Sequence, residues 1–346
     1  MTLNTYNLVY ATLYKYFYSL LYINKYGKIE GLIYATFNMK KRLPNQKFRK
    51  LVPKLRRKGF YNPQEKREIN WKKYNLSQTK EATKIFEEIK ILVDSCKIKQ
   101  MNNLGRKGKD GKILAKIILV CELMQLTERQ AQGWINLLAP NINLTSDIDD
   151  RTVGRAYNNL EIQYLLKQVF EKTKNSDGVL SGDGTGLETT RKQNYENDKK
   201  TNEYFTSSVD SREIVQAFEM NKKEKEAMRK MLAEVKGNSL RLDAGFVDRK
   251  LTSMISELGM KPFIFPKKNI DLNGRIAWKT MYLELFFETQ DWLREYHQRS
   301  HCESFHSSFK RRNKPLMKNN QISRLTQLTA RIIIHNLRKW NYYCLF

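Results

Sequence analysis

Apolar side chains recur at helical spacing in the region from residue 77 to residue 172. In the run KEATKIFEEIKILV, residues 82, 85, 86 and 89 share one face of a helix, and Ser77 precedes the run as its expected N-cap. The run KILAKIILVCEL predicts a second helix after a glycine-rich loop. Thr127 and Gln130 have the spacing of a capping box, which predicts the start of a third helix. We therefore expect residues 77–172 to be helical.

Two helical runs in this region resemble a helix-turn-helix. The run ERQAQGWINLL is followed, after a turn, by the short basic run DDRTVGRAYNNL. About ten residues separate the two runs, which is longer than the usual turn of that motif. The pattern is compatible with a helix-turn-helix without specifying one.

The pattern changes after residue 177, where short runs of apolar and alternating residues begin. GVLSGDGTGLE, EYFTSSVD and REIVQAFEM predict three consecutive strands. KEKEAMRKMLAEVK predicts a helix, SLRLDAG a fourth strand, DRKLTSMISELG a second helix and KPFIFPKK a fifth strand, before long C-terminal helices. This order predicts an α/β domain with a mixed sheet flanked by helices, preceded by a helical, basic N-terminal region.

The N-terminal segment combines tyrosines with an apolar run. Tyrosines recur at every fourth residue from Tyr6 to Tyr26, which predicts a helix that packs on another subunit or domain, or one that stacks bases. Residues 8–23 are apolar but contain Lys15 and many tyrosines, unlike a membrane span or a secretory signal, so we expect no membrane insertion. Met39 is an alternative start to Met1.

Charge points to a polyanionic partner. The 346 residues carry a net charge of +27, and residues 40–73 hold 14 Lys or Arg against two Glu, with aromatic residues between them. Such an arm neutralises backbone phosphates, although a solvated linker would look the same. Four scattered cysteines without CxxC spacing indicate neither disulfides nor a zinc ribbon, and fit a reducing cytosol. We divide the chain into an aromatic and basic arm (1–75), a helical DNA-binding domain (76–172) and a catalytic domain (173–346).

Three carboxylates stand at regular intervals in the predicted catalytic domain. Asp183 is expected to end the first strand, Asp243 ends the fourth, and Glu303 lies on a later helix, with 59 residues in each gap. In a ribonuclease H-like sheet the first and fourth strands are neighbours, so the carboxylates would converge and repel one another unless cations bind. Oxygen ligands suit two Mg²⁺ ions, and Mn²⁺ is expected to substitute. Glycines around Asp183 would let a nucleic acid approach closely.

A second group of side chains shares one stripe of the predicted helix. At ~100° per residue, Tyr296, Arg299, Glu303 and Lys310 lie within a narrow sector, with both charge signs and an aromatic ring. Trp292, four residues before Tyr296, falls in the same sector. A solvated face could produce this mixture by chance for any one residue, but the four together with the two aspartates indicate a site.

The sequence resembles a known family at these positions. Asp183 in LSGDGTGL, Asp243 in LRLDAGF and the Y-x2-R-x3-E-x6-K spacing at residues 296–310 look like the DDE insertion-sequence transposases that carry the Tyr-Arg-Glu-Lys signature. FIFPKKN is also similar to the fifth strand of that family. The likeness covers roughly residues 177–312 and implies a ribonuclease H-like fold.

The resemblance implies a role for each matching residue. Asp183, Asp243 and Glu303 would be catalytic and bind the metals. Arg299 and Lys310 would hold phosphates of a transposon end, and Tyr296 would contact the same DNA. Many relatives insert a β-rich domain before the Glu, for which 59 residues leave no room. That departure leaves the route of second-strand cleavage, by a hairpin or otherwise, open.

Other readings of these residues are less favoured. His297, His301, Cys302 and His306 surround Glu303 and could suggest zinc, but on a helix they do not share one side. GDGTG could suggest a dinucleotide loop, but its third glycine is misplaced and ETTRKQN after it does not start an apolar helix. Further aspartates are expected in turns and caps rather than as ligands: Asp177, Asp210 and Asp248. Trp292 is read either as a residue that stacks a displaced base or, in preference, as core packing at the start of its helix.

The expected function is cut-and-paste transposition of an insertion sequence. End cleavage by water and attack of the freed 3′-OH on target DNA would both use two Mg²⁺ ions. The expected partners are double-stranded DNA, as inverted-repeat ends and target, and a second copy of the chain in a homodimer, in a prokaryotic cytoplasm near the nucleoid. The alternatives are a nuclease of the same fold without strand transfer, and a non-catalytic or domesticated DNA-binding protein.

Overall fold

The computed structural model describes most of the chain beyond residue 68. The described residues are 69–98, 109–143, 147–189, 201–267 and 273–344. The tyrosine-rich segment and most of the basic arm lie outside them. The chain divides into two compact units, one of Met1–Asn62 with Pro266–Leu293 and one of Pro63–Phe265 with Arg294–Phe346. The second unit contains the sheet and most of the helices.

In its described part, the predicted helical region consists of helices joined by short turns. Its elements are α4 (Trp71–Thr79), α5 (Glu81–Asp94), α6 (Gly111–Met124), α7 (Glu128–Leu138), the 3-10 turn η1 (Ala139–Ile142), α8 (Asp150–Ala156) and α9 (Leu160–Thr173). The expectation for Ser77 was wrong, because Ser77 lies inside α4 and Lys80 caps α5. The Ser77 hydroxyl donates to the Tyr74 carbonyl instead of capping a helix.

Side-chain caps begin most of these helices. The predicted capping box is confirmed: Thr127 accepts from the Gln130 backbone, and the Gln130 side chain accepts from the Thr127 backbone. Asp149 and Asn159 accept from backbone N–H groups at the starts of α8 and α9. Each cap satisfies a donor that the first helical turn leaves open. Local sequence therefore sets these helix starts.

Helix α6 is the centre of the helical layer and is buried on nearly all sides. Its apolar residues pack among α5, α8, α9 and the long C-terminal helix α15 (Gln321–Cys344). Glu122, on α6, is 3% exposed. Its carboxylate accepts from Arg331 (2.7 Å) and Gln327 (3.0 Å) of α15 and from the Tyr157 hydroxyl (2.7 Å). This buried network attaches the C-terminal helix to the helical layer.

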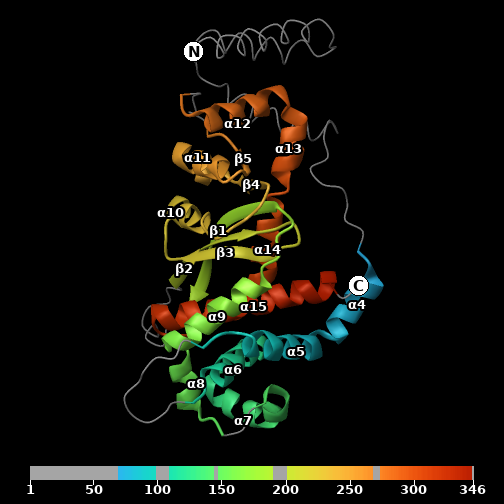
Figure 1. Ribbon diagram of the computed structural model, residues 1–346, viewed down its shortest axis with the longest axis vertical. Coiled ribbons are helices and arrows are strands. Elements are labelled where there is room, and N and C mark those ends of the chain that lie inside the picture. The colour runs from blue at the N-terminus through green and yellow to red at the C-terminus, as the bar shows by residue number, and fades with distance from the viewer. Residues whose placement is uncertain (1–68, 99–108, 144–146, 190–200, 268–272, 345–346) are drawn as a thin grey trace, which may run out of the picture. The chain divides into compact units, whose positions relative to one another are not determined.

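The predicted order of strands and helices after residue 177 is confirmed. It runs β1 (Val179–Thr189), β2 (Thr201–Val209), β3 (Val215–Met220), α10 (Glu224–Met231), β4 (Ser239–Leu242), η2 (Ala244–Phe246), α11 (Arg249–Glu257) and β5 (Lys261–Ile264). The five strands form one mixed sheet in the order β3-β2-β1-β4-β5 (Figure 1). Strand β1 is antiparallel to β2 and parallel to β4, as a ribonuclease H-like sheet requires.

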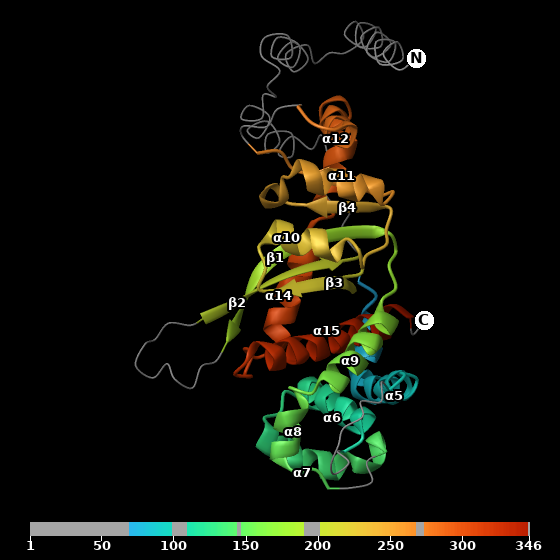
Figure 2. The same cartoon turned by 60° about the vertical axis from the view of Figure 1, so that its left-hand side comes forward.

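Helices cover both faces of the sheet. Phe205 of β2 packs against Phe305 and Phe309 of α14 (Ser300–Arg312), with ring centroids 6.3 and 6.2 Å apart. The neighbouring residue Tyr204 points to the other face and bonds Glu224 of α10. Because successive strand residues point to opposite faces, α14 and α10 lie on opposite sides of the sheet (Figure 2).

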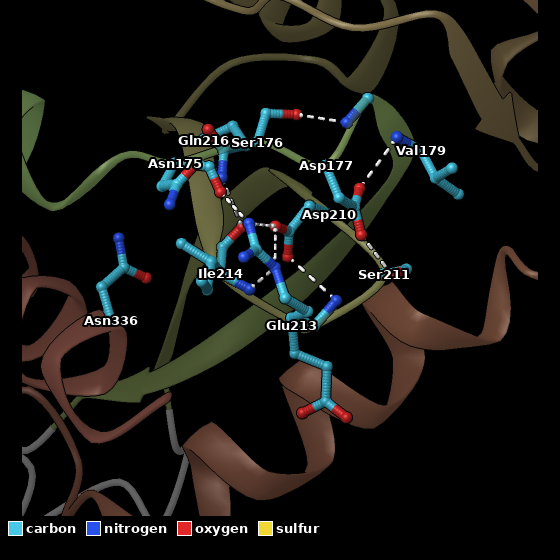
Figure 3. A network of polar contacts seen from close by, with 12 residues as sticks. Asn175, Ser176, Asp177, Val179, Asp210, Ser211, Glu213, Ile214, Gln216 and Asn336 are labelled. Carbon is cyan, nitrogen blue, oxygen red and sulfur yellow. Dashed lines mark hydrogen bonds and ion pairs between the residues drawn. The ribbon is translucent and has the colours of Figure 1, made fainter. Parts of the chain in front are cut away.

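The polar turn between β2 and β3 and the segment before β1 hold two of the aspartates that were expected to be structural. The Asp210 carboxylate accepts from the Ile214 N–H (2.9 Å) and pairs with Arg212 (2.8 Å), while Asp177 accepts from the Val179 N–H (Figure 3). Asp248 caps α11 by accepting from the Leu251 N–H. All three carboxylates are therefore engaged in local structure, as predicted.

The other unit contributes α12 (Ile276–Phe287) and the first part of α13 (Thr289–His297) to the described residues. Within it, the rings of Trp278 and Tyr282 meet edge to face at 4.8 Å. Among the described residues, no helix combines the length and the apolar character needed to cross a bilayer.

The Glu122 network gives a test of the packing. Replacing Glu122 with Leu leaves the Arg331 guanidinium buried without its carboxylate, and we expect the free energy of unfolding to fall by about 3–5 kcal/mol. Urea denaturation measures this change. The double variant Glu122→Leu/Arg331→Met should recover most of the loss. Glu87→Leu, which removes an exposed carboxylate paired with Lys84, should cost under about 1 kcal/mol. Equal losses for Glu122→Leu and Glu87→Leu would contradict the role of the network.

Candidate active site

The parallel pairing of β1 with β4 brings two aspartates together. The last residues paired between β1 and β4 are Gly182 and Leu242. Asp183 and Asp243 directly follow these two residues in the sequence. The sequence predicted that Asp183 ends its strand, and this prediction was wrong. Strand β1 continues past Asp183 to Thr189, and there it pairs with β2 alone. Asp243 directly follows β4 and accepts from the Gly245 N–H at 2.6 Å.

The stripe predicted on one helix is divided between two. The helix α13 ends at His297 and α14 begins at Ser300, with a turn at residues 298–299. Within the turn, the Arg299 N–H bonds the Tyr296 carbonyl (3.0 Å) and the Cys302 N–H bonds the Arg299 carbonyl (3.1 Å), both three residues apart. The prediction of one continuous helix was therefore wrong.

The turn nevertheless places Arg299 among the carboxylates. One guanidinium nitrogen lies 2.5 Å from a Glu303 oxygen, and another lies 3.7 Å from an Asp183 oxygen. The guanidinium carbon is 6.0 Å from the centre of the Tyr296 ring, within the range of a cation–π contact. Arg299 thus acts as an internal counter-ion for two of the three predicted ligands.

Buried Arg241 helps to hold this turn in place. Arg241, on β4, is 1% exposed. Its guanidinium donates to the Glu295 carbonyl (2.7 Å) and pairs with the Glu295 carboxylate. Since Glu295 precedes Tyr296, the strand that carries Asp243 also fixes the end of α13.

The remaining residues of the predicted stripe have different environments. Lys310 is exposed, and its ammonium donates to the Thr185 hydroxyl of β1. Tyr296 is 9% exposed and packs on the Phe265 ring at 5.3 Å, and burial raises the pKa of its hydroxyl to about 12. Trp292 lies on α13 in the other compact unit and is 3% exposed.

Two further side chains, which the sequence did not reveal, lie beside the aspartates. The Tyr204 hydroxyl donates to Glu224 Oε1 at 2.5 Å. Burial, the Glu224 carboxylate and the charges of Asp183 and Asp243 all raise the pKa of Tyr204. Topology is the signal that could have found Glu224: β3 is parallel to β1, so the helix after β3 starts at the edge where the aspartates lie.

The electrostatics of the site are those of crowded carboxylates. The pKa of Asp183 is raised to about 6, first by burial and then by the charges of Asp243 and Glu303. The Gly184 N–H at 2.9 Å and the Arg299 guanidinium oppose this shift. Carboxylates therefore concentrate at one sheet edge of a chain whose net charge is +27.

These oxygens suit hard divalent cations such as Mg²⁺. The Asp243 and Glu224 carboxylates also lie close together, since each has an oxygen 2.8 Å from the position that a Cβ on Gly245 would occupy. Among the described residues, no three His, Cys, Asp or Glu side chains are close enough to share one ion. The Glu303 carboxylate is paired with Arg299. To bind a cation here, the Glu303 carboxylate would exchange its contact with Arg299 for one with the ion.

The residues considered for zinc are packed inside the domain. Cys302 and His306 are buried on α14, and the His306 Nε2 is 2.8 Å from the Ser207 hydroxyl of β2. Burial lowers the pKa of His306 to about 4 and raises that of Cys302. Both side chains join α14 to the sheet.

Comparison with known proteins gives one match. Residues 174–337 match the family described as a transposase DDE domain, a region that contains all the predicted site residues. The match supports a DDE transposase family for this part of the chain, and divalent metal ions are general in that family. No curated protein and no solved structure matches the chain significantly.

The raised pKa of Asp183 predicts a stabilising mutation. Because its pKa rises from 3.8 to about 6 on folding, the folded state takes up the proton more readily, and stability falls as pH rises through this interval. Asp183→Asn should therefore raise the free energy of unfolding of the metal-free protein at pH 7.5 by about 1–2 kcal/mol, and hardly change it at pH 4. Urea denaturation in EDTA at both pH values measures the effect.

The exposed residue Asp147 provides the matched control, since Asp147→Asn should leave stability unchanged at both pH values. Destabilisation by Asp183→Asn at pH 7.5 would show that the carboxylate makes net favourable contacts in the folded state, contrary to this account.

Proposed function

We propose that this chain is a transposase that moves a DNA element by cut-and-paste, cutting the element's ends and joining them to target DNA by two-metal phosphoryl transfer. The observation that carries the proposal is the meeting of Asp183 and Asp243 at the β1–β4 edge, with Arg299 and Glu303 facing them, inside the matched transposase domain. Carboxylates at one point with a guanidinium beside them suit a reaction in which phosphate is held and charge develops on oxygen.

In this proposal Asp183, Asp243 and Glu303 hold two Mg²⁺ ions, or Mn²⁺ in their place. Bound metal would activate the attacking oxygen and stabilise the leaving one. The carboxylates serve to position the ions rather than to transfer protons. Because Arg299 now neutralises two of them, its guanidinium becomes available to a phosphate when the ions take over that role.

DNA contacts are assigned to cationic and aromatic groups around the carboxylates. Lys310, exposed and held toward β1 by Thr185, would bind a phosphate next to the one that reacts. Tyr296 would support Arg299 through its ring, with Phe265 packed behind it. The Tyr-Arg-Glu-Lys signature is thus read as one phosphate-handling unit.

The remaining parts of the chain complete the proposal. Residues 1–75 would bind DNA through charge, and residues 76–172 would recognise inverted-repeat ends. A homodimer would bring two ends together, on DNA in the cytoplasm of a prokaryote. A nuclease of the same fold would cut without joining, and a domesticated DNA-binding protein would do neither. Joining of pre-cut ends to target DNA distinguishes a transposase from a nuclease. Cutting of DNA distinguishes either enzyme from a non-catalytic DNA-binding protein.

The alanine variants of the three predicted ligands test the chemistry. Asp183→Ala, Asp243→Ala and Glu303→Ala should each abolish Mg²⁺-dependent cutting of DNA taken from the flanks of the gene, while DNA affinity changes little, because affinity comes from Lys and Arg. Gel analysis of cutting and a filter-binding isotherm give the two readouts. Asp147→Ala serves as the control, and Mg²⁺-dependent cutting by any of the three variants would refute the assignment.

Trp292 separates base stacking from packing. Since it is 3% exposed, we expect Trp292→Ala to lower the free energy of unfolding by about 3–5 kcal/mol and Trp292→Phe to have a small effect. Melting temperature and cutting are measured on the same preparations. A loss of cutting at unchanged melting temperature would instead support a displaced base stacked on the indole.

A further inference from the structure

We propose that Glu224 is a fourth carboxylate ligand of the metal site, and that with Asp243 it holds the second divalent cation on the side of the sheet opposite Glu303. This inference rests on the proposed function, which supplies the metal site. It assigns to Glu224 a role that the three-carboxylate signature does not contain.

The topology brings Glu224 to the site. Glu224 is the first residue of α10, which follows β3 after a short turn. Because β3 runs parallel to β1 and β4, its C-terminal end lies at the same sheet edge as Asp183 and Asp243. Glu224 is half-buried there rather than projecting into solvent.

The distances place Glu224 beside Asp243. Glu224 Oε2 and Asp243 Oδ1 each lie 2.8 Å from the position that a Cβ on Gly245 would occupy. The two oxygens are therefore separated by no more than twice that distance. Ligand oxygens lie ~2.1 Å from Mg²⁺ and up to ~2.6 Å from larger cations, so a small rotation of either side chain lets one ion contact both.

Two glycines keep the space around Glu224 clear. A Cβ on Gly184 would lie 3.0 Å from Glu224 Oε1 and closer still to the Tyr204 hydroxyl, and a Cβ on Gly245 would meet Glu224 and Asp243 together. Neither glycine has a positive φ, so backbone conformation does not require glycine at these positions. Both glycines therefore leave room for the side chains of Glu224 and its neighbours to come this close to the backbone.

Tyr204 orients Glu224 without neutralising it. The Tyr204 hydroxyl occupies Oε1, which leaves Oε2 directed to the side of Asp243. In the described part of the chain, no Lys, Arg or His forms an ion pair with Glu224 or Asp243, whereas Asp183 and Glu303 share Arg299. A cation between Glu224 and Asp243 would supply the missing positive charge.

The two faces of the sheet each carry one glutamate near the aspartates, an arrangement that suits two ions. Glu303 lies on α14, which covers one face of the sheet, and Glu224 lies on α10, which covers the other (Figure 1). Asp183 and Asp243 lie between, at the edge that both faces share. Each ion would then have one glutamate of its own and access to the central aspartates.

The simpler explanation is that Glu224 stabilises the start of α10 through the helix dipole. Glu226 lies in the same first turn, is exposed and would serve that purpose equally. It therefore provides a matched control, because Glu224→Gln and Glu226→Gln remove the same charge from the same turn.

The experiment counts bound Mn²⁺ on the full chain without DNA, by electron paramagnetic resonance of free Mn²⁺ and by calorimetry. We expect two ions for the wild type and for Glu226→Gln, and one ion for Glu224→Gln. Tyr204→Phe should keep both ions but weaken one by roughly ten-fold, as removal of an orienting hydrogen bond does. Melting curves of each variant in EDTA confirm that it is folded.

Two outcomes would overturn the inference in different ways. If Glu224→Gln binds two ions with unchanged affinity while Glu303→Gln loses one, Glu224 is not a ligand and the proposed function stands. If the wild type and Asp243→Asn bind Mn²⁺ equally, there is no metal site at the aspartates, and the proposed function fails together with this inference.

Discussion

The parallel pairing of β1 with β4 is the constraint on which the site depends. Gly182 pairs with Leu242, and the next residue on each strand is an aspartate. A slip by one residue would separate Asp183 from Asp243 and turn one strand's side chains to the wrong face. Buried Leu180, Leu240 and Leu242 oppose such a slip, since it would remove them from their packing. The apolar packing of the sheet therefore fixes the position of its most polar residues.

This placement has an electrostatic cost that the surrounding structure reduces. Burial and neighbouring carboxylates raise the pKa of Asp183, and the Arg299 guanidinium pairs with it. The turn between α13 and α14 is what directs Arg299 to Asp183, and Arg241 holds that turn through Glu295. Further away, the Glu122–Arg331 pair joins α15 to the helical layer. The charged side chains of the site are thus held by elements far apart in sequence.

Sequence predicted those features that depend on local pattern. Short apolar runs separated by turn residues gave the strand order, and the Thr127–Gln130 box gave a helix start. The convergence of Asp183 and Asp243 was predicted from strand ends, although β1 runs on because β2 offers backbone partners beyond Asp183. Features that depend on tertiary contacts were missed. The break at residues 298–299 has no proline or glycine to mark it, and Glu224 lies outside the Tyr-Arg-Glu-Lys spacing.

We propose above that Asp183 and Asp243 together form a site for divalent cations. Anomalous scattering of Mn²⁺ in crystals of the full chain tests this directly, because it locates the ion without reference to activity. We expect a peak within coordination distance, ~2.0–2.6 Å, of carboxylate oxygens of both aspartates. Saturating Mn²⁺ with ordered Asp183 and Asp243 side chains and no peak between them would contradict it.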